Sequence, residues 1–151
     1  MYDSPPVFFQ EEDVSYDVDN EEVVKFWLYN VALAEDHTLE NLTVIFCTDM
    51  FLHEMNMMYL DHDEYTDVIT FDNSERDGNI EADIYISLER VIDNAGKFNT
   101  GMPNELYRVM VHGLLHLFGY NDKTEEEKVK IRDREEHYLQ QLKARQDHNN
   151  N

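Results

Sequence analysis

The sequence predicts an α+β fold in which helices pack on a mixed sheet of about four strands. Runs rich in β-branched and aromatic residues alternate with segments of helical periodicity, and neither an internal repeat nor a linker divides the chain. A length of 151 residues with 42% hydrophobic content is enough for one compact domain. We expect this domain to span residues 1 to 145, followed by a disordered tail, residues 146 to 151, that ends in three asparagines.

Four segments have the composition of strands. The first lies within residues 7 to 18 and includes an acidic bend, and residues 42 to 47 form a run that we expect to be buried. Residues 67 to 71 and 82 to 87 are each preceded by a polar loop. The single cysteine, Cys47, excludes an internal disulfide and is expected to be a small core residue.

Five segments have the apolar spacing or the end signals of helices. Met55, Met57 and Met58 in the second of them are interpreted as core-filling residues rather than as part of a cofactor site. Thr124 and Glu127 form a capping box at the start of the last. The expected helices span residues 20 to 36, 50 to 59, 88 to 95, 104 to 118 and 124 to 144.

The strongest chemical signal lies in the fourth helix and in the residues after it. His112 and His116 are four residues apart, so both imidazoles lie on one helical face and converge on one point. Gly119 is a natural helix end, and Asp122 follows at a distance from which its carboxylate reaches the same point. Two imidazoles and one carboxylate hold a divalent ion with an open position, as in catalytic zinc sites. The alternative, two helix histidines satisfied by backbone carbonyls, accounts for neither the glycine nor the aspartate at this spacing.

The same spacing matches the zinc metalloprotease pattern H-E-x-x-H-x-x-G-x-x-H, with Asp122 at the position of the last histidine. Zinc proteases carry their general base, a glutamate, directly after the first histidine. Here that residue is Gly113, which offers neither an acid nor a base. The helix is therefore zincin-like, but the residue that a protease needs is missing.

Three blocks of the sequence carry a family resemblance. The specific one is residues 105 to 120, with the run His-Gly-Leu-Leu-His-Leu, and residues 66 to 71 and 82 to 87 support it. These blocks resemble the YbeY family of bacterial ribosomal-RNA maturation factors, whose signature reads H-G-x-L-H-L-x-G-Y-D-H, and the similarity covers most of residues 7 to 140. The resemblance implies a metal-dependent, single-strand-directed endoribonuclease in small-subunit ribosomal RNA maturation and ribosome quality control. It implies the small ribosomal subunit as a partner, with a basic ribosomal protein or the GTPase Era as further partners.

The chain departs from the family pattern at the metal ligands and at one arginine. The family's last histidine falls on Asp122, and the acidic residue before it falls on Asn121. Because a carboxylate oxygen binds zinc at about the distance of an imidazole nitrogen, we expect one zinc ion per chain, with manganese or magnesium less favoured. The arginine that the family carries six residues before Thr66 falls on Leu60. His62 either replaces part of its charge or is a solvated loop histidine.

The expected chemistry is hydrolysis of a phosphodiester bond. A divalent ion lowers the pKa of a bound water from about 16 to near 7 and polarises a phosphoryl oxygen. Arg108, one helical turn before His112, is the candidate for a phosphate contact or for orienting Asp122, and its alternative is an i to i+3 pair with Glu105. His62 is the candidate general acid.

The net charge of −21 opposes binding to a polyanion such as RNA. The charge is uneven, however, because residues 1 to 100 contain 24 acidic and 4 basic side chains, whereas residues 101 to 151 contain 9 acidic and 8 basic ones. We therefore expect RNA contacts in the C-terminal third, close to the metal motif. The acidic remainder is either a solvated surface or a contact for a basic protein.

The sequence has neither the apolar length of a membrane protein nor the start of a secreted one. No stretch has the length of a membrane-spanning helix, and the N-terminus lacks the basic and apolar regions of a signal peptide, so we expect a cytoplasmic protein without a membrane partner. One alternative is a ribosome-assembly factor with a structural metal site and weak or no nuclease activity, which the missing arginine and the acidic surface favour. The other is a metalloprotease.

Overall fold

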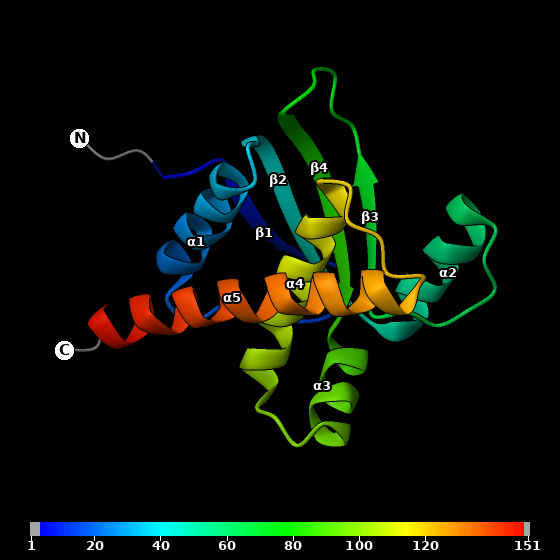
Figure 1. Ribbon diagram of the computed structural model, residues 1–151. Coiled ribbons are helices and arrows are strands. Elements are labelled where there is room, and N and C mark those ends of the chain that lie inside the picture. Colours follow the sequence, from blue (N-terminus) through cyan, green and yellow to red (C-terminus); the bar gives the residue numbers. More distant parts are fainter. Residues whose placement is uncertain (1–3, 150–151) are drawn as a thin grey trace.

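A computed structural model describes residues 4 to 149 of the protein (Figure 1). Over these residues the chain forms four strands and five helices. In chain order they are β1 (Val7–Glu11), α1 (Glu21–Ala34), β2 (Thr38–Cys47), α2 (Asp49–Leu60), β3 (Val68–Asp72), β4 (Asn79–Ser87), α3 (Leu88–Lys97), α4 (Met102–Leu117) and α5 (Glu125–Asn149).

The strands form one mixed sheet in the order β1-β2-β4-β3. β1, β2 and β4 are parallel, and β3 is antiparallel to β4. The predicted α+β class with a mixed four-stranded sheet is therefore confirmed. β2 begins at Thr38, earlier than predicted, because this polar end of the strand pairs with Asn79 of β4. β1 ends at Glu11 and does not extend to residue 18.

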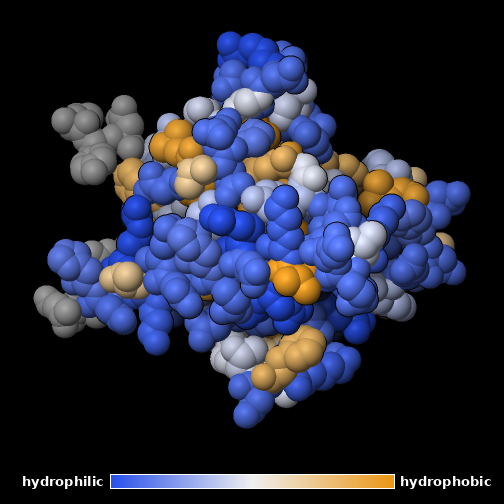
Figure 2. Space-filling view, in the orientation of Figure 1, coloured by the Kyte–Doolittle hydropathy of each residue, from blue (hydrophilic) through white to orange (hydrophobic). Residues whose placement is uncertain are grey.

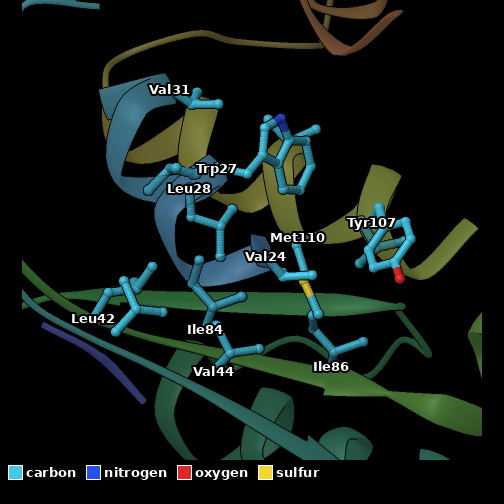
Figure 3. Packing of buried hydrophobic residues seen from close by; sticks show 14 of the residues in the cluster. Val24, Trp27, Leu28, Val31, Leu42, Val44, Ile84, Ile86, Tyr107 and Met110 are labelled. Atoms are coloured by element: carbon cyan, nitrogen blue, oxygen red, sulfur yellow. The ribbon is translucent and has the colours of Figure 1, made fainter. Parts of the chain in front are cut away.

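The main hydrophobic core lies between one face of the sheet and helices α1 and α4 (Figure 3). Because side chains alternate along a strand, Ile84 and Ile86 of β4 both face this core, where Trp27 of α1 and Met110 of α4 pack. The indole N–H of Trp27 also donates to the backbone carbonyl of Tyr138 in α5, at 2.8 Å. This bond joins α5 to α1, and Ile131, Tyr138 and Leu142 of α5 are themselves part of the core.

A smaller apolar cluster lies on the opposite face of the sheet, under α2. It contains Cys47 and Leu52, so the prediction that Cys47 is a buried core residue is confirmed. Met55 packs against this cluster, but Met57 and Met58 are 47% and 73% exposed, and the prediction that they fill the core is wrong. Leu52 fixes the buried side of α2, and at 100° per residue positions 57 and 58 lie on its far side.

The last helix begins as predicted and ends later. The backbone N–H of Thr124 donates to the Glu127 carboxylate at 2.9 Å, and the N–H of Glu127 donates to the Thr124 hydroxyl at 3.1 Å, which confirms the capping box. α5 continues to Asn149, so the predicted disordered tail is wrong for residues 146 to 149, while residues 150 and 151 lie outside the described part. No proline or glycine interrupts this stretch. Within the described residues, no helix is both long and apolar enough to cross a bilayer.

Candidate metal centre

The histidine-bearing helix α4 lies so close to the sheet that Gly113 has no room for a side chain. A Cβ atom at this position would lie 3.2 Å from Cγ2 of Ile84, 3.3 Å from Cγ2 of Thr70 and 3.4 Å from Cγ2 of Val68. These residues belong to β4 and β3, the two strands under α4. The glycine after the first histidine therefore sets the depth of the helix on the sheet, and it leaves no space for the glutamate of a zinc protease.

We expect Gly113→Ala to be less stable than Gly96→Ala by about 1–3 kcal/mol. Both substitutions replace a helical glycine, so both gain up to about 1 kcal/mol of helix propensity. Gly96 has no atom within 4 Å of an added Cβ, so only Gly113→Ala adds a steric cost. Urea unfolding of the two variants at equal metal content measures the difference, and equal stabilities would contradict the close approach of α4 to the sheet.

A glycine turn ends α4 and returns the chain towards the histidines. Gly119 has a φ of 105°, in the left-handed region that favours glycine. Its N–H donates to the carbonyl of His116 at 3.0 Å, and the N–H of Tyr120 donates to the carbonyl of Leu115 at 3.1 Å. These two bonds close the helix end, and the reversed chain brings Asp122 beside both histidines.

Three possible ligand atoms converge beside α4. The Nε2 atoms of His112 and His116 are 2.9 Å apart, and Oδ2 of Asp122 lies 3.4 Å from the first and 3.3 Å from the second. Zinc with tetrahedral bonds of about 2.0–2.1 Å places its ligand atoms about 3.3 Å apart. The side chains are 24%, 28% and 42% exposed. The three residues therefore fit a divalent ion, and their exposure leaves one side open to a substrate.

The second ring nitrogen of each histidine already has a partner. Nδ1–H of His116 donates to the backbone carbonyl of Tyr120 at 2.8 Å, and Nδ1–H of His112 donates to the carboxylate of Glu135 at 2.6 Å. In a neutral imidazole this leaves Nε2 as an acceptor in both rings. Two acceptors and a carboxylate facing each other at hydrogen-bond distance repel unless a proton or a metal ion lies between them. Histidines that bind metals are oriented in this way by a carboxylate or a carbonyl.

Glu135 is the site residue that the sequence analysis missed. It belongs to α5 and is 4% exposed, and its second carboxylate oxygen accepts from Arg108 at 3.2 Å. Its neighbours on the same helical face, Ile131, Tyr138 and Leu142, are buried apolar or aromatic residues. The position of this glutamate among apolar residues on one helical face could have indicated its role, because a buried carboxylate needs a charged or hydrogen-bonding partner.

The carboxylates around His112 favour its protonated form when no metal is bound. Burial lowers the pKa of His112, but the hydrogen bond and charge of Glu135, with Asp67 and Asp122, outweigh this effect and raise the pKa above 6.5. Burial also raises the pKa of the carboxyl groups of Asp67 and Glu105. The metal-free site therefore holds protons that a metal ion must displace.

The metal-free protein should therefore lose stability as the pH rises from about 6 to about 8. The raised pKa of His112 contributes stability that is complete below about pH 6.5 and is lost as the pH rises through the folded-state value. Saturating zinc should stabilise the protein more at about pH 8 than at about pH 6, because zinc binds the neutral imidazoles. Urea unfolding with chelator and with zinc at both pH values measures the two trends. Greater stability of the metal-free protein at the higher pH would contradict the raised pKa.

Arg108 lies on α4 and lines the cavity at the metal centre. Its guanidinium pairs with Glu105 at 3.5 Å, the i to i+3 partner considered above, and with Glu135 at 3.2 Å and Glu136 at 2.5 Å. Within the described part of the chain it forms no ion pair with Asp122. Its charge is thus already balanced by carboxylates. One of them, Glu135, also accepts the hydrogen bond from His112, so Arg108 is linked to His112 through Glu135.

The structure does not bring His62 to the metal centre. His62 is exposed in the loop after α2, and its backbone N–H donates to the carbonyl of Asn56 at 3.1 Å. Leu60, at the position of the family arginine, is 40% exposed. Neither residue lines the cavity of about 440 Å³ that contains His112 and Asp122.

Comparison with known proteins identifies the family. The family model of Endoribonuclease YbeY matches residues 7 to 143. The chain belongs to the YbeY family. Endoribonuclease YbeY of Cytophaga hutchinsonii is 48% identical over 130 residues, which cover 86% of this chain and 91% of the relative. Endoribonuclease YbeY of Amoebophilus asiaticus is 46% identical over 133 residues, which cover 88% of this chain and 90% of the relative.

A solved structure shares the YbeY fold described above. The solution structure of TM1509 from Thermotoga maritima matches with a TM-score of 0.64 at 24% identity, over 95% of this chain and 93% of that chain. The resemblance of the sequence to the YbeY family is therefore confirmed, and the fold that it implied agrees with the mixed sheet and with the histidine-bearing helix.

Proposed function

We propose that this YbeY-family protein is a metal-dependent endoribonuclease that cleaves single-stranded RNA in small-subunit ribosomal RNA maturation and ribosome quality control. The observation that carries the proposal is the convergence of two imidazole nitrogens and one aspartate oxygen, 2.9 to 3.4 Å apart, in a relative of endoribonucleases. The proposed ion is zinc, one per chain, because two nitrogens and one carboxylate with tetrahedral spacing suit it. Manganese and magnesium favour sites richer in oxygen ligands.

In this proposal His112, His116 and Asp122 hold the ion. A bound divalent ion activates water as a nucleophile near neutral pH and polarises a phosphoryl oxygen. The chain supplies the geometry, because Glu135 and the Tyr120 carbonyl fix both imidazoles with Nε2 towards the common point. The open side of the three ligands admits the phosphodiester.

Arg108 has the role of a positioning residue in this proposal. It joins Glu135 and Glu136 of α5 to α4, and it thereby holds the carboxylate that orients His112. A direct phosphate contact would require the guanidinium to exchange one of these carboxylates for the substrate. His62 has no part in the proposed chemistry, because it is exposed outside the cavity.

A ribosome-assembly factor with a structural metal site is the second candidate. Leu60 stands where the family has an arginine, and the net charge of −21 weakens RNA binding. A metalloprotease is disfavoured by the packing of Gly113. In either of the first two roles we propose that the protein works in the cytoplasm on the small ribosomal subunit. Its acidic residues 1 to 100 would then face a basic ribosomal protein or the GTPase Era.

The test uses purified protein that is stripped with a chelator and reloaded with zinc, manganese or magnesium. Elemental analysis should find one ion per chain, and the loaded protein should cleave a single-stranded RNA in preference to the matched duplex. Ribosome binding without cleavage by the metal-loaded protein would favour the assembly factor. Hydrolysis of a peptide library without RNA cleavage would revive the protease, and full activity in the presence of the chelator would exclude a metal-dependent nuclease.

A further inference from the structure

The metal centre lies at one end of a groove between α4 and α5. The cavity of about 440 Å³ is lined by His112 and Asp122, by α5 and by the connection between α3 and α4. A second hollow of about 220 Å³ continues between α4 and the C-terminal half of α5, and Thr100 and Arg108 line both. The groove therefore leads away from the metal centre along α5, which crosses in front of α4 in Figure 1.

We propose that this groove is the path of the RNA strand, with Arg132 bound to a backbone phosphate and Phe98 stacked on a base beside the cleaved bond. The inference rests on the nuclease function proposed above. Both residues lie outside the metal motif, and the strand leaves the metal centre along α5.

Among the described residues, Arg132 is the cation of this cavity that forms no ion pair. Arg108 pairs with three carboxylates, and Lys128 pairs with Glu125 at 3.5 Å. Arg132 is exposed, and within residues 4 to 149 no carboxylate lies at ion-pair distance from it, although its charge acts on Glu105 over a longer range. In a chain of net charge −21, an unmatched guanidinium beside the metal centre is a site for a phosphate.

A second unmatched cation lies further along the groove. Lys143 lines the second hollow, and within the described chain it too has no ion pair. It follows Arg132 by eleven residues, or about 16 Å along the helix axis. One positive charge therefore lies in each of the two hollows, where both can contact phosphates of the same strand.

Phe98 supplies a flat apolar surface on the other wall of the cavity. It follows α3 directly, it is 67% exposed, and within the described residues its ring has no aromatic partner. Figure 2 shows apolar side chains gathered over α3, next to the hydrophilic surface of α5. Proteins that bind single strands combine a positive groove with exposed aromatic rings on which the bases stack. A strand between the two walls would thus place a base on Phe98 and a phosphate on Arg132.

This arrangement selects single strands. The bases of a duplex are stacked and paired, so a ring on one wall of the groove stacks on a base only when the strand is unpaired. Phe98 and the metal centre line the same cavity, and the stacked base is therefore next to the bond that is cut.

The test measures binding without cleavage. Chelator-treated protein is titrated with a fluorescently labelled single-stranded RNA at several salt concentrations. We expect Phe98→Ala and Phe98→Leu both to weaken binding about 5- to 100-fold, because leucine keeps the apolar bulk but has no ring to stack on. We expect Arg132→Gln to weaken binding and to reduce the slope of log K against log salt by about 0.7, the value for one phosphate of a single strand.

Arg145→Gln is the matched control. Arg145 is an exposed arginine of α5, without an ion pair in the described part, and at 100° per residue it lies on the opposite flank of the helix from Arg132. Equal effects of Arg132→Gln and Arg145→Gln, wild-type binding by Phe98→Leu, or no binding by the wild type at low salt would each overturn the groove. If the protein cleaves RNA with metal but the Phe98 and Arg132 variants bind RNA like the wild type, the nuclease function holds and the proposed groove is wrong. If RNA binding changes in the variants as expected but the metal-loaded protein does not cleave RNA, the groove holds and the nuclease function is wrong.

Discussion

Asp122→Ala should release the metal ion and lower RNA cleavage by more than about a hundredfold. This loss is larger than that caused by substituting a residue that only hydrogen-bonds to a metal ligand. Oδ2 of Asp122 is the third atom of the cluster, 3.4 and 3.3 Å from the two imidazole nitrogens. Without it two ligands remain, too few for a stable zinc site. Asp122→His should retain metal and activity, because the family signature carries histidine there. Elemental analysis and cleavage rates of the three proteins measure the effect.

The controls separate the ligand from the general acidity of the surface. His112→Ala and His116→Ala should behave like Asp122→Ala. Asp133→Ala removes an exposed carboxylate of α5 that has no contact with the cluster, and should leave both metal content and cleavage unchanged. A full complement of metal in Asp122→Ala would show that another group completes the site.

Glu135→Gln should weaken metal binding and cleavage by about 10- to 100-fold. The substitution preserves volume but removes the charge that lies 2.6 Å from Nδ1 of His112, so the ring becomes a weaker donor to the metal and is less firmly held. Competition with a chromophoric chelator measures the zinc affinity, and circular dichroism verifies the fold. The carboxylate is 4% exposed, so bulk solvent does not substitute for its charge.

Glu136→Gln is the matched control for this effect. Glu136 pairs with the same Arg108, at 2.5 Å, but within the described contacts it does not touch His112. It should therefore retain wild-type metal affinity. If Glu135→Gln and Glu136→Gln lowered the affinity equally, Arg108 would be the group that matters, and the orientation of His112 by Glu135 would be wrong.

The convergence of the three ligand atoms was predictable because it is local. Helical periodicity brings His112 and His116 together, and one glycine turn is enough to return Asp122. Glu135 was not predictable in the same way, because it reaches His112 only through the packing of α5 on α4, and the sequence does not fix the angle and register of two helices. Arg108 shows the same limit, since two of its three carboxylate partners also come from α5.

The fold was predictable in its class and less so in its boundaries. Strand composition and helical periodicity identified the elements of the described chain, but pairing with β4 extended β2 back to Thr38. The exposed methionines of α2 show that an apolar residue in a helix says little about burial when only one side of the helix has a neighbour. Tertiary contacts determine the exposure of Met57 and Met58, and these contacts follow from the position of α2 at one face of the sheet.

The residues around the metal centre come from both α4 and α5, so a bound ion affects how these two helices move relative to each other. α5 packs chiefly on α4 and α1 rather than on the sheet, yet it supplies Glu135, and the turn before it supplies Asp122. An ion bound by Asp122 and by the histidine that Glu135 orients would hold α5 against α4. Amide hydrogens in the middle of α5 should then exchange with deuterium more slowly when zinc is present, while those of β4, already held by neighbours on both sides, should exchange at the same rate with and without it.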